Sequence, residues 1–310
     1  MAARTLVVVN PKSRGGSTRR RFEPVERRLR EVLGELEVEW TRGPRDAVRI
    51  AREGVRAGVE RIVVAGGDGT IGEVVDGVLA AGHGADCQIG LLPFGTGGDL
   101  SRTLGPPRDL GAAVAALAEE TSRSVDAGRV HFEGPDRHGE VVHFANAASA
   151  GISGLTTFLV NRAPKQLGGR ASFFLGTVRS LLRYSFPPMR IAVDGKLLHE
   201  GPLTLAAACN GRFFGGGMQV APDAVPDDGL LDLILVPAYS RARLLTRLPR
   251  IYRGTHLREA GVVHTRGRSI ELDPLSDEPV WIELDGEPLG RLPVRVEILP
   301  AAMNFFGVGR

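Results

Sequence analysis

The sequence predicts two domains: an α/β domain built on a parallel sheet, followed by a mostly antiparallel β-sandwich. The length of 310 residues favours two domains, and a hydrophobic content of 43% is enough for a sizeable core in each. Up to residue 123, short apolar runs alternate with helical patterns, which is typical of a parallel sheet with crossover helices. From residue 124 on, strand patterns predominate, and Asp-Gly pairs at 194–195 and 285–286 indicate hairpins.

The apolar periodicity locates the elements of the first domain. Short β-branched runs predict strands at 5–9, 36–40, 62–65 and 88–92. Apolar residues three and four positions apart predict helices at 17–33, 45–57, 71–81 and 110–117. Ser17 is a suitable N-cap for the first of these helices.

The segment 61–73 organises this domain. Strand 62–65 runs into the turn 66–70, Gly-Gly-Asp-Gly-Thr, and a helix follows from Ile71. Such glycines let the backbone approach a phosphate, and the following helix N-terminus offers free N–H groups. Asp68 would repel a phosphate unless a divalent cation or a proton lies between them. The turn therefore favours a metal–nucleotide.

Gly67, Gly69 and Gly72 also match the dinucleotide fingerprint G-x-G-x-x-G. That fingerprint expects an acidic residue at the end of the next strand, where this chain has Pro93 and Phe94. A nicotinamide site and a purely structural glycine turn remain alternatives.

Two further glycine-rich turns follow strands. Lys12 and Arg14 in the turn after strand 5–9 could face a phosphate or form a solvated basic loop. The turn after strand 88–92 contains Thr96 and Asp99. Because parallel strands end at one edge of a sheet, we expect the three turns to meet there, with Asp68 and Asp99 sharing one metal–phosphate site.

In the second domain, strands are predicted at 124–132, 141–145, 189–193, 203–209, 230–236, 269–272, 280–284 and 294–299, with helices near 154–161, 171–183 and 241–253. The apolar face of 173–184 is either core or a flap beside an apolar substrate. Segment 213–232 is rich in glycine and aspartate, and is either a surface turn or an all-oxygen cation site.

Composition narrows the classes of function. A net charge of +3, with arginine far exceeding lysine, suits phosphate ligands or an anionic membrane surface. An aromatic content of 5% argues against a nucleic-acid binder that stacks bases. Cys87 and Cys209 lie in apolar runs, so we expect buried thiols in a reducing compartment. No signal peptide or apolar run of about 20 residues is visible, so we expect a cytoplasmic protein.

Several motifs follow one another along nearly the whole chain: Asn10-Pro11, 66–70, 92–96 with Asp99, 215–218 with Ala221-Pro222, Asp227-Asp228-Gly229 and Asp285-Gly286-Glu287. In this order they resemble the diacylglycerol kinase catalytic family, which includes bacterial lipid kinases, sphingosine kinases and ceramide kinases. Gly-Gly-Asp-Gly-Thr alone also occurs in NAD kinases, and the later motifs favour the lipid-kinase branch.

The resemblance implies a Rossmann-like domain of the NAD-kinase and diacylglycerol-kinase type at 1–123, which binds ATP and takes back the C-terminal segment 300–310. It implies a lipid-binding β-sandwich at 124–299. Glu287 matches the proton acceptor, and Asp68 and Asp99 match an aspartate–water–magnesium network. A second, structural Mg²⁺ matches Asp228 with main-chain oxygens of Val225 and Leu230. The implied ATP contacts are Asn10, Pro11, Lys12, Ser13, Arg14, Thr41, Gly67, Asp68, Gly69, Thr70, Ile71, Gly72, Glu73 and Thr96.

One position departs from the family pattern, because Gly98 stands where the family usually has asparagine. The resulting expectation is an ATP-dependent kinase of a diacylglycerol-like lipid, peripherally associated with the membrane and not with nucleic acid. An NAD kinase and a catalytically impaired nucleotide- or lipid-binding regulator are the alternatives. Strand-rich domains often have a sheet edge that is free to pair, which leaves a homodimer open.

Overall fold

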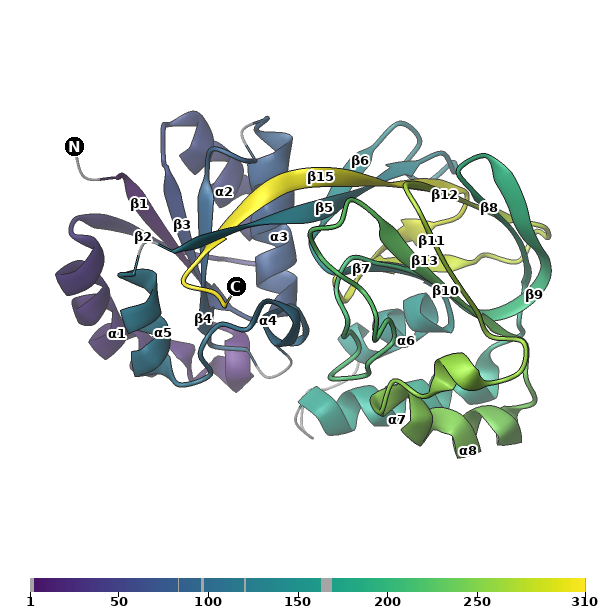
Figure 1. The fold of residues 1–310 in the computed structure, drawn as a ribbon. Helices are drawn as coiled ribbons and strands as arrows, with labels where there is room; N and C mark the ends of the chain where they lie inside the picture. The colour runs from purple at the N-terminus through teal and green to yellow at the C-terminus, as the bar shows by residue number, and fades with distance from the viewer. Residues whose placement is uncertain (1–2, 83, 96–97, 120, 163–168, 310) are drawn as a thin grey trace.

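The computed structural model describes residues 3–82, 84–95, 98–119, 121–162 and 169–309, with the backbone alone at 14–15, 160–162 and 169–175. Two halves lie side by side, and one strand ladder runs through both (Figure 1). Its hydrogen-bonded order is β14-β13-β7-β9-β8-β12-β15-β4-β3-β1-β2.

The N-terminal half is a parallel sheet between two layers of helices. Its strands, in the order β2-β1-β3-β4, are β2 (Leu36–Trp40), β1 (Thr5–Val9), β3 (Arg61–Gly66) and β4 (Gln88–Pro93). All five residues of β1 are buried, as expected for a strand covered on both faces. The helices are α1 (Thr18–Leu33), α2 (Asp46–Arg56), α3 (Asp68–Ala80), α4 (Asp99–Leu104) and α5 (Leu110–Leu117), with the 3₁₀ turn η1 (Ser13–Gly16) before α1.

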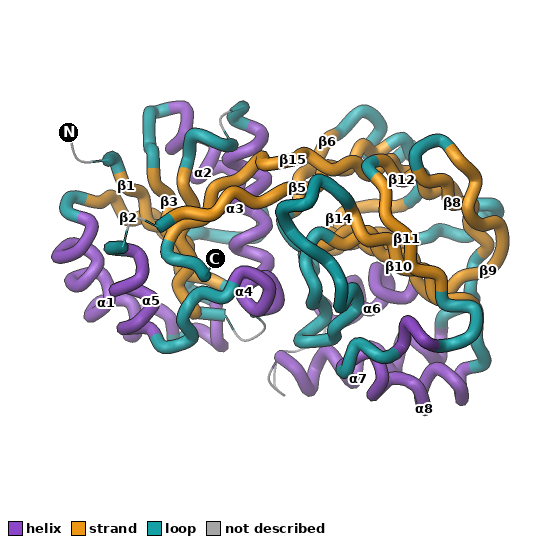
Figure 2. The backbone as a smooth tube through the Cα atoms, viewed as in Figure 1, coloured by secondary structure: helices purple, strands orange, loops and turns teal. Residues whose placement is uncertain are grey.

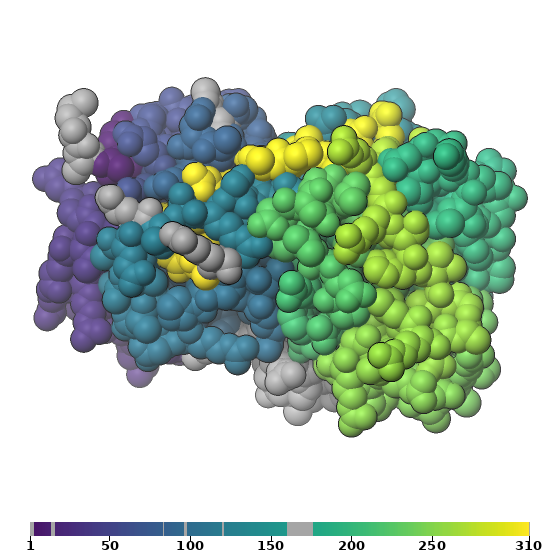
Figure 3. Space-filling view, viewed as in Figure 1, coloured from purple at the N-terminus to yellow at the C-terminus, as the bar shows by residue number. Residues whose placement is uncertain are grey.

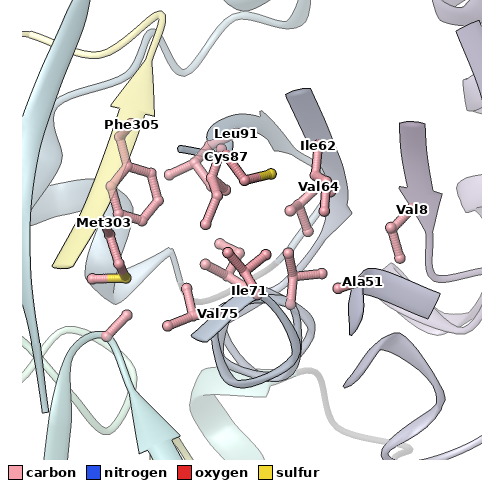
Figure 4. Close-up of a cluster of buried hydrophobic side chains, with 14 of the residues drawn as sticks. Val8, Ala51, Ile62, Val64, Ile71, Val75, Cys87, Leu91, Met303 and Phe305 are labelled. Carbon is pink, nitrogen blue, oxygen red and sulfur yellow. The ribbon is translucent and has the colours of Figure 1, made fainter. Parts of the chain in front are cut away.

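Each face of this sheet has its own core. On one face, side chains of β1, β3 and β4 pack against α2 and α3 (Figure 4). On the other face, alternate residues of the same strands pack against α1 and α5. The alternation of side chains in β1 and β3 therefore supplies both cores at once.

The C-terminal half is a β-sandwich. One layer contains β5 (Ser122–Phe132), β6 (Val141–Phe144), β8 (Pro188–Val193), β12 (Ser269–Pro274) and β15 (Val294–Phe306). The other contains β7 (Ala147–Gly151), β9 (Lys196–Cys209), β10 (Leu231–Pro237), β11 (Val263–Gly267), β13 (Trp281–Leu284) and β14 (Glu287–Arg291). The long strand β9 pairs with β8 in one layer and with β7 and β10 in the other, and a third core fills the space between the layers.

Three helices cover the outer face of the second layer (Figure 2). They are α6 (Ile152–Arg162), α7 (Gly169–Arg183) and α8 (Arg241–Tyr252), and the 3₁₀ turn η2 (His256–Arg258) follows α8. None of the helices in the described part of the chain combines the length and apolar character that crossing a bilayer requires.

Strands β5 and β15 join the two halves. They pair antiparallel from Phe132 and Val294 at one end to Ser122 and Phe306 at the other. Strand β15 also pairs with β12 in the sandwich and, through its last residues, with β4 in the parallel sheet. The C-terminal strand, yellow in Figures 1 and 3, therefore runs back across the molecule to the N-terminal half.

The predicted fold class is confirmed, and so is the burial of Cys87 and Cys209. Some element predictions were wrong. Helix α3 begins at Asp68, so Asp68, Gly69 and Thr70 form its first turn and not a loop before it. Helix α4 and strands β7, β11 and β14 were missed, because their small, polar or Pro-containing sequences carry no strand or helix pattern.

Candidate active site

The three glycine-rich turns meet at the carboxyl edge of the parallel sheet. Asn10 donates its backbone N–H to Ala65 O at 3.0 Å, and its Nδ2 to Thr70 Oγ1 at 2.9 Å, which links the first turn to the second. The second and third turns touch, since a Cβ on Gly95 would lie 2.6 Å from Gly67 Cα. The predicted convergence of the turns is therefore confirmed.

The other predicted nucleotide contacts surround this edge. Backbone N–H groups of Lys12 and Ser13 bond to Asn10 Oδ1 and Asn10 O, so Asn10 shapes the turn that contains Pro11. The backbone N–H of Thr41 donates to Val9 O at 2.9 Å, which places the end of β2 beside the end of β1. The side chain of Arg14 and the whole of Thr96 lie outside the described residues.

Among the predicted nucleotide contacts, the side chains of Ile71 and Glu73 make contacts within the protein instead. Ile71 is buried in the core between the sheet and α3, so only its backbone can face a ligand. Glu73 accepts the backbone N–H groups of Arg45 and Ala47, each at 3.0 Å, and so holds the start of α2. Burial raises the pKa of Glu73.

Asp68 and Asp99 are brought together, as predicted. Asp68 Oδ1 accepts the backbone N–H of Leu100 at 3.4 Å, and Asp99 Oδ2 accepts that of Gly216 at 2.8 Å. Burial raises the pKa of both carboxyl groups, and the neighbouring charge of Asp68 helps to raise the pKa of Asp99 to about 6. Two neighbouring carboxylates, with Asp99 buried and Asp68 half-buried, concentrate negative charge that a cation would stabilise.

Gly98, which departs from the family pattern, precedes α4 with a φ of +66°. Glycine and asparagine are the residues that adopt this left-handed conformation at least cost. Among the described residues, a Cβ there would meet only Ser101 Cβ, at 3.8 Å. Glycine in place of asparagine at position 98 therefore keeps the backbone conformation that presents Asp99, and removes only a side-chain amide.

Glu287 reaches the same edge from the C-terminal half, at the turn between β13 and β14. This turn packs directly on α3, because α3 presents glycines to it. A Cβ on Gly69 would lie 3.0 Å from Glu287 Oε1, and a Cβ on Gly72 would lie 2.9 Å from the Asp285 side chain. Gly69 and Gly72, two of the fingerprint glycines, therefore also allow the two halves of the chain to approach each other closely.

Asp285 anchors this turn. Its carboxylate accepts three backbone N–H groups from the corner between β6 and β7: Ala145 at 2.8 Å, Asn146 at 2.9 Å and Ala147 at 3.0 Å. Burial raises the pKa of Asp285 to about 6 in spite of these bonds. The position of Glu287 therefore depends on a carboxylate two residues away that accepts three backbone N–H groups.

Glu283 supports the turn from the other side and was missed by the sequence reasoning. It accepts the backbone N–H of Gly286 at 2.7 Å and the hydroxyl of Ser149. Burial raises its pKa to about 7. The sequence does contain a signal for the role of Glu283, because this glutamate lies within the apolar run 280–284. Glutamates are rarely buried unless their carboxyl groups are paired, so its position indicates a specific partner.

Replacing Glu283 with glutamine should change how stability depends on pH. Between pH 4.5 and about 7 the unfolded chain releases a proton that folded Glu283 retains, so stability falls as pH rises, by about 3 kcal/mol in all. Glutamine carries no such penalty. The melting temperature of Glu283→Gln should therefore exceed that of the wild type more at pH 8 than at pH 5. Glu271→Gln, exposed on β12, is the control, and a pH-independent difference for Glu283→Gln would contradict the argument.

A cavity of about 360 Å³ leads from this edge into the C-terminal half. Its polar end is lined by Gly67, Asp68, Gly69, Asp99 and Glu287. Its inner part lies between the second sheet layer and helices α6 to α8, and its aliphatic lining includes Ile152, Leu181, Leu205, Val236, Leu244, Leu248, Ile251 and Val262. Thr177 and Leu181 of α7 face it, whereas Phe173 and Phe174 lie outside the described side chains.

The residues of the predicted second metal site are not among those that line this cavity. Asp228 Oδ1 accepts the backbone N–H of Leu230 at 3.0 Å, and its Oδ2 lies 3.4 Å from Arg266 Nη1. Arg266 also donates to Asp223 O at 3.0 Å, so a guanidinium already supplies positive charge to this loop. Among the described residues, no cluster of three or more acidic, histidine or cysteine side chains suits a metal. Magnesium at Val225, Asp228 and Leu230 stays a prediction.

Comparisons with known proteins identify two matching family domains in the chain. Residues 4–130 match the diacylglycerol kinase catalytic domain, and residues 146–307 match the YegS C-terminal NAD kinase beta sandwich-like domain. The chain is 30% identical to a Mycobacterium tuberculosis protein named diacylglycerol kinase, over 84% of this chain and 80% of that one. It is 32% identical to a "Probable lipid kinase YegS-like" of Chromohalobacter salexigens, over 89% and 85%.

Solved structures share the whole architecture. One is a Bacillus anthracis protein described as "a putative diacylglycerol kinase", with a TM-score of 0.77 at 25% identity. The match covers 97% of this chain and 96% of the Bacillus anthracis chain. Yeast NADH kinase, with a TM-score of 0.60 at 14% identity, shares the fold. The chain therefore belongs to the YegS-like lipid kinases, phosphotransferases that act on an alcohol and carry a diacylglycerol kinase catalytic domain.

Proposed function

We propose that the protein transfers the γ-phosphoryl group of ATP to the hydroxyl of a diacylglycerol-like lipid. One observation carries this proposal: the carboxylates at the sheet edge and an aliphatic interior line the same cavity. A lipid can place its hydroxyl at the polar end and its acyl chains among the leucines. The ribose hydroxyls of NAD would lose their hydrogen bonds to water in that interior, which costs free energy.

In this proposal, residues 1–123 with 300–310 bind ATP, and 124–299 bind the lipid. The glycine turns at Gly67 and Gly95 would hold the triphosphate by their backbone N–H groups and by close approach. Glu287 would accept the proton of the lipid hydroxyl while its oxygen bonds to the γ-phosphorus. The bond from that phosphorus to the β–γ bridging oxygen breaks, and ADP leaves. Positioning supplies most of the rate in such transfers.

We propose that Asp68 and Asp99 hold Mg²⁺ with the nucleotide. Asp99 Oδ1 supports this, because it is buried and accepts no hydrogen bond from the described residues, with Arg102 Nε 3.6 Å away. An acceptor of this kind suits a hydrated cation. When bound, the ion would offset the negative charge of the phosphates.

The test is phosphate transfer from labelled ATP to diacylglycerol in detergent micelles, with NAD as the alternative acceptor. We expect labelled lipid and no labelled NAD. Labelled NAD would support an NAD kinase. ATP binding without transfer to any lipid of a broad panel would support a nucleotide-binding regulator.

A cavity-filling variant tests the role of the aliphatic interior. Leu244→Trp should lower kcat/KM for a long-chain diacylglycerol by at least about tenfold, because the ring would occupy space that an acyl chain needs. The KM for ATP should not change. Leu197→Trp, exposed on β9, is the control. An unchanged kcat/KM in Leu244→Trp, with the fold intact, would place the lipid elsewhere.

A further inference from the structure

We propose that the outer side of α7 and α8 docks on a bilayer that contains anionic lipid. This surface, named here the helical face, consists of the exposed side chains of 176–184 and 241–253. The inference deepens the proposed function and rests on it, because it states from where the lipid enters the cavity. Three observations support it: charge, exposed apolar side chains and the position of α8 over the cavity.

The helical face and the turn after it are strongly basic. Residues 176–184 and 241–258 contain eight arginines and no acidic residue. The next residue, Glu259, is shared by three guanidinium groups, with Arg243 at 3.8 Å, Arg247 at 3.4 Å and Arg250 in direct contact. Because Arg247 and Glu259 also line the cavity, this cluster lies on the cavity side of α8, and its one carboxylate cannot neutralise three cations. Arg179, Arg183 and Arg253 are exposed to solvent and add positive charge to the surface. Such a surface attracts the anionic headgroups of a membrane.

The same surface exposes large apolar side chains. Leu182 near the end of α7 is 61% exposed, and Leu245 on α8 is 38% exposed. Leu245 also lines an outer groove with Leu248, Pro249, Tyr252 and Arg253. The two helices lie against each other, since Arg241 donates to Leu181 O at 3.0 Å and to Tyr184 O at 3.3 Å. Leucine beside arginine is typical of helices that lie in a membrane interface.

Helix α8 separates this surface from the cavity. None of the twelve residues of α8 is fully buried, so the helix is open to solvent on its outer side. On its inner side, Leu244, Leu248 and Ile251 line the cavity. Leu248 borders both the cavity and the outer groove. A lipid that passes beside α8 from a bilayer would reach the cavity without exposing its acyl chains to water. A nucleic acid would match the charge alone and leave the leucines exposed, so a bilayer is the better match.

The test is sedimentation of the full chain with vesicles of phosphatidylcholine alone or with about one third phosphatidylglycerol. We expect binding to the anionic vesicles and at least a tenfold weaker partition to the neutral ones. The double variant Leu182→Glu, Leu245→Glu should lower partition to anionic vesicles at least tenfold. The control is Leu197→Glu, since Leu197 is also 61% exposed but lies on β9. Circular dichroism and melting temperature verify the fold of each variant.

Two further measurements separate this inference from the proposed function. The variant Glu287→Gln should bind anionic vesicles like the wild type, whether or not transfer to lipid is observed. The double variant should phosphorylate a short-chain, water-soluble diacylglycerol at the wild-type rate and lose activity only on vesicles. Equal vesicle binding by the double variant and the wild type would overturn the inference. So would binding of a DNA duplex, and not of vesicles, that the same substitutions weaken.

Discussion

Glu287→Gln should lower kcat by about 10²- to 10⁴-fold, which is the usual contribution of a general base. Glutamine has nearly the same size as glutamate, so the contact with Gly69 and the turn between β13 and β14 should survive. It cannot accept a proton from the lipid hydroxyl. The KM for ATP should change little, since the glycine turns that would hold the nucleotide are untouched. Steady-state transfer from labelled ATP to diacylglycerol measures both constants.

The control for this substitution is again Glu271→Gln, which makes the same chemical change on exposed β12. Its kcat should equal that of the wild type. If Glu287→Gln kept wild-type activity, Glu287 would not be the proton acceptor. The observed contact between Glu287 and Gly69 would then have only a packing role.

Asp285→Ala should lower the free energy of unfolding by about 3 kcal/mol, because three buried backbone N–H groups lose their acceptor. The loss is moderated by the desolvation cost of the wild-type carboxylate, which its raised pKa reveals. Activity should fall as well, since Glu287 shares the turn. Urea unfolding followed by circular dichroism measures the stability.

Asp194→Ala is a matched control for this variant. Asp194 also begins an Asp-Gly hairpin with a φ of 48°, as Asp285 does, so alanine brings the same backbone strain to both sites. It accepts the N–H groups of Arg268 and Ser269, each at 2.9 Å, but at an exposed site where water can replace it. The loss should therefore be clearly smaller than at Asp285. Equal losses would show that the buried bonds of Asp285 contribute nothing beyond the turn.

Most of the N-terminal half could be predicted from local patterns. Strands such as β1 and β2 have the predicted bounds, since their apolar runs and the turns around them are complete signals in themselves. The convergence of the turns containing Asn10, Asp68 and Asp99 also followed, because parallel strands end at one edge. The missed strand β7 has a sequence of small residues, and pairing with β9 and β13 far along the chain makes it a strand. Strand β14 pairs with β13 directly before it, across the predicted hairpin at Asp285-Gly286, and was missed because Pro288 and Gly290 weaken its strand pattern.

The sequence by itself determined the two-part fold and the motifs that identify a phosphotransferase, because turn glycines and strand patterns act over a few residues. Only the tertiary structure decided that Gly69 and Gly72 of α3 receive the turn of Glu287 and Asp285 from the other half. It also decided that Glu283 is enclosed beneath that turn and that α8 covers an aliphatic cavity. The reason is physical: burial and close approach are properties of segments distant in sequence, and no local pattern contains the partner that each segment meets.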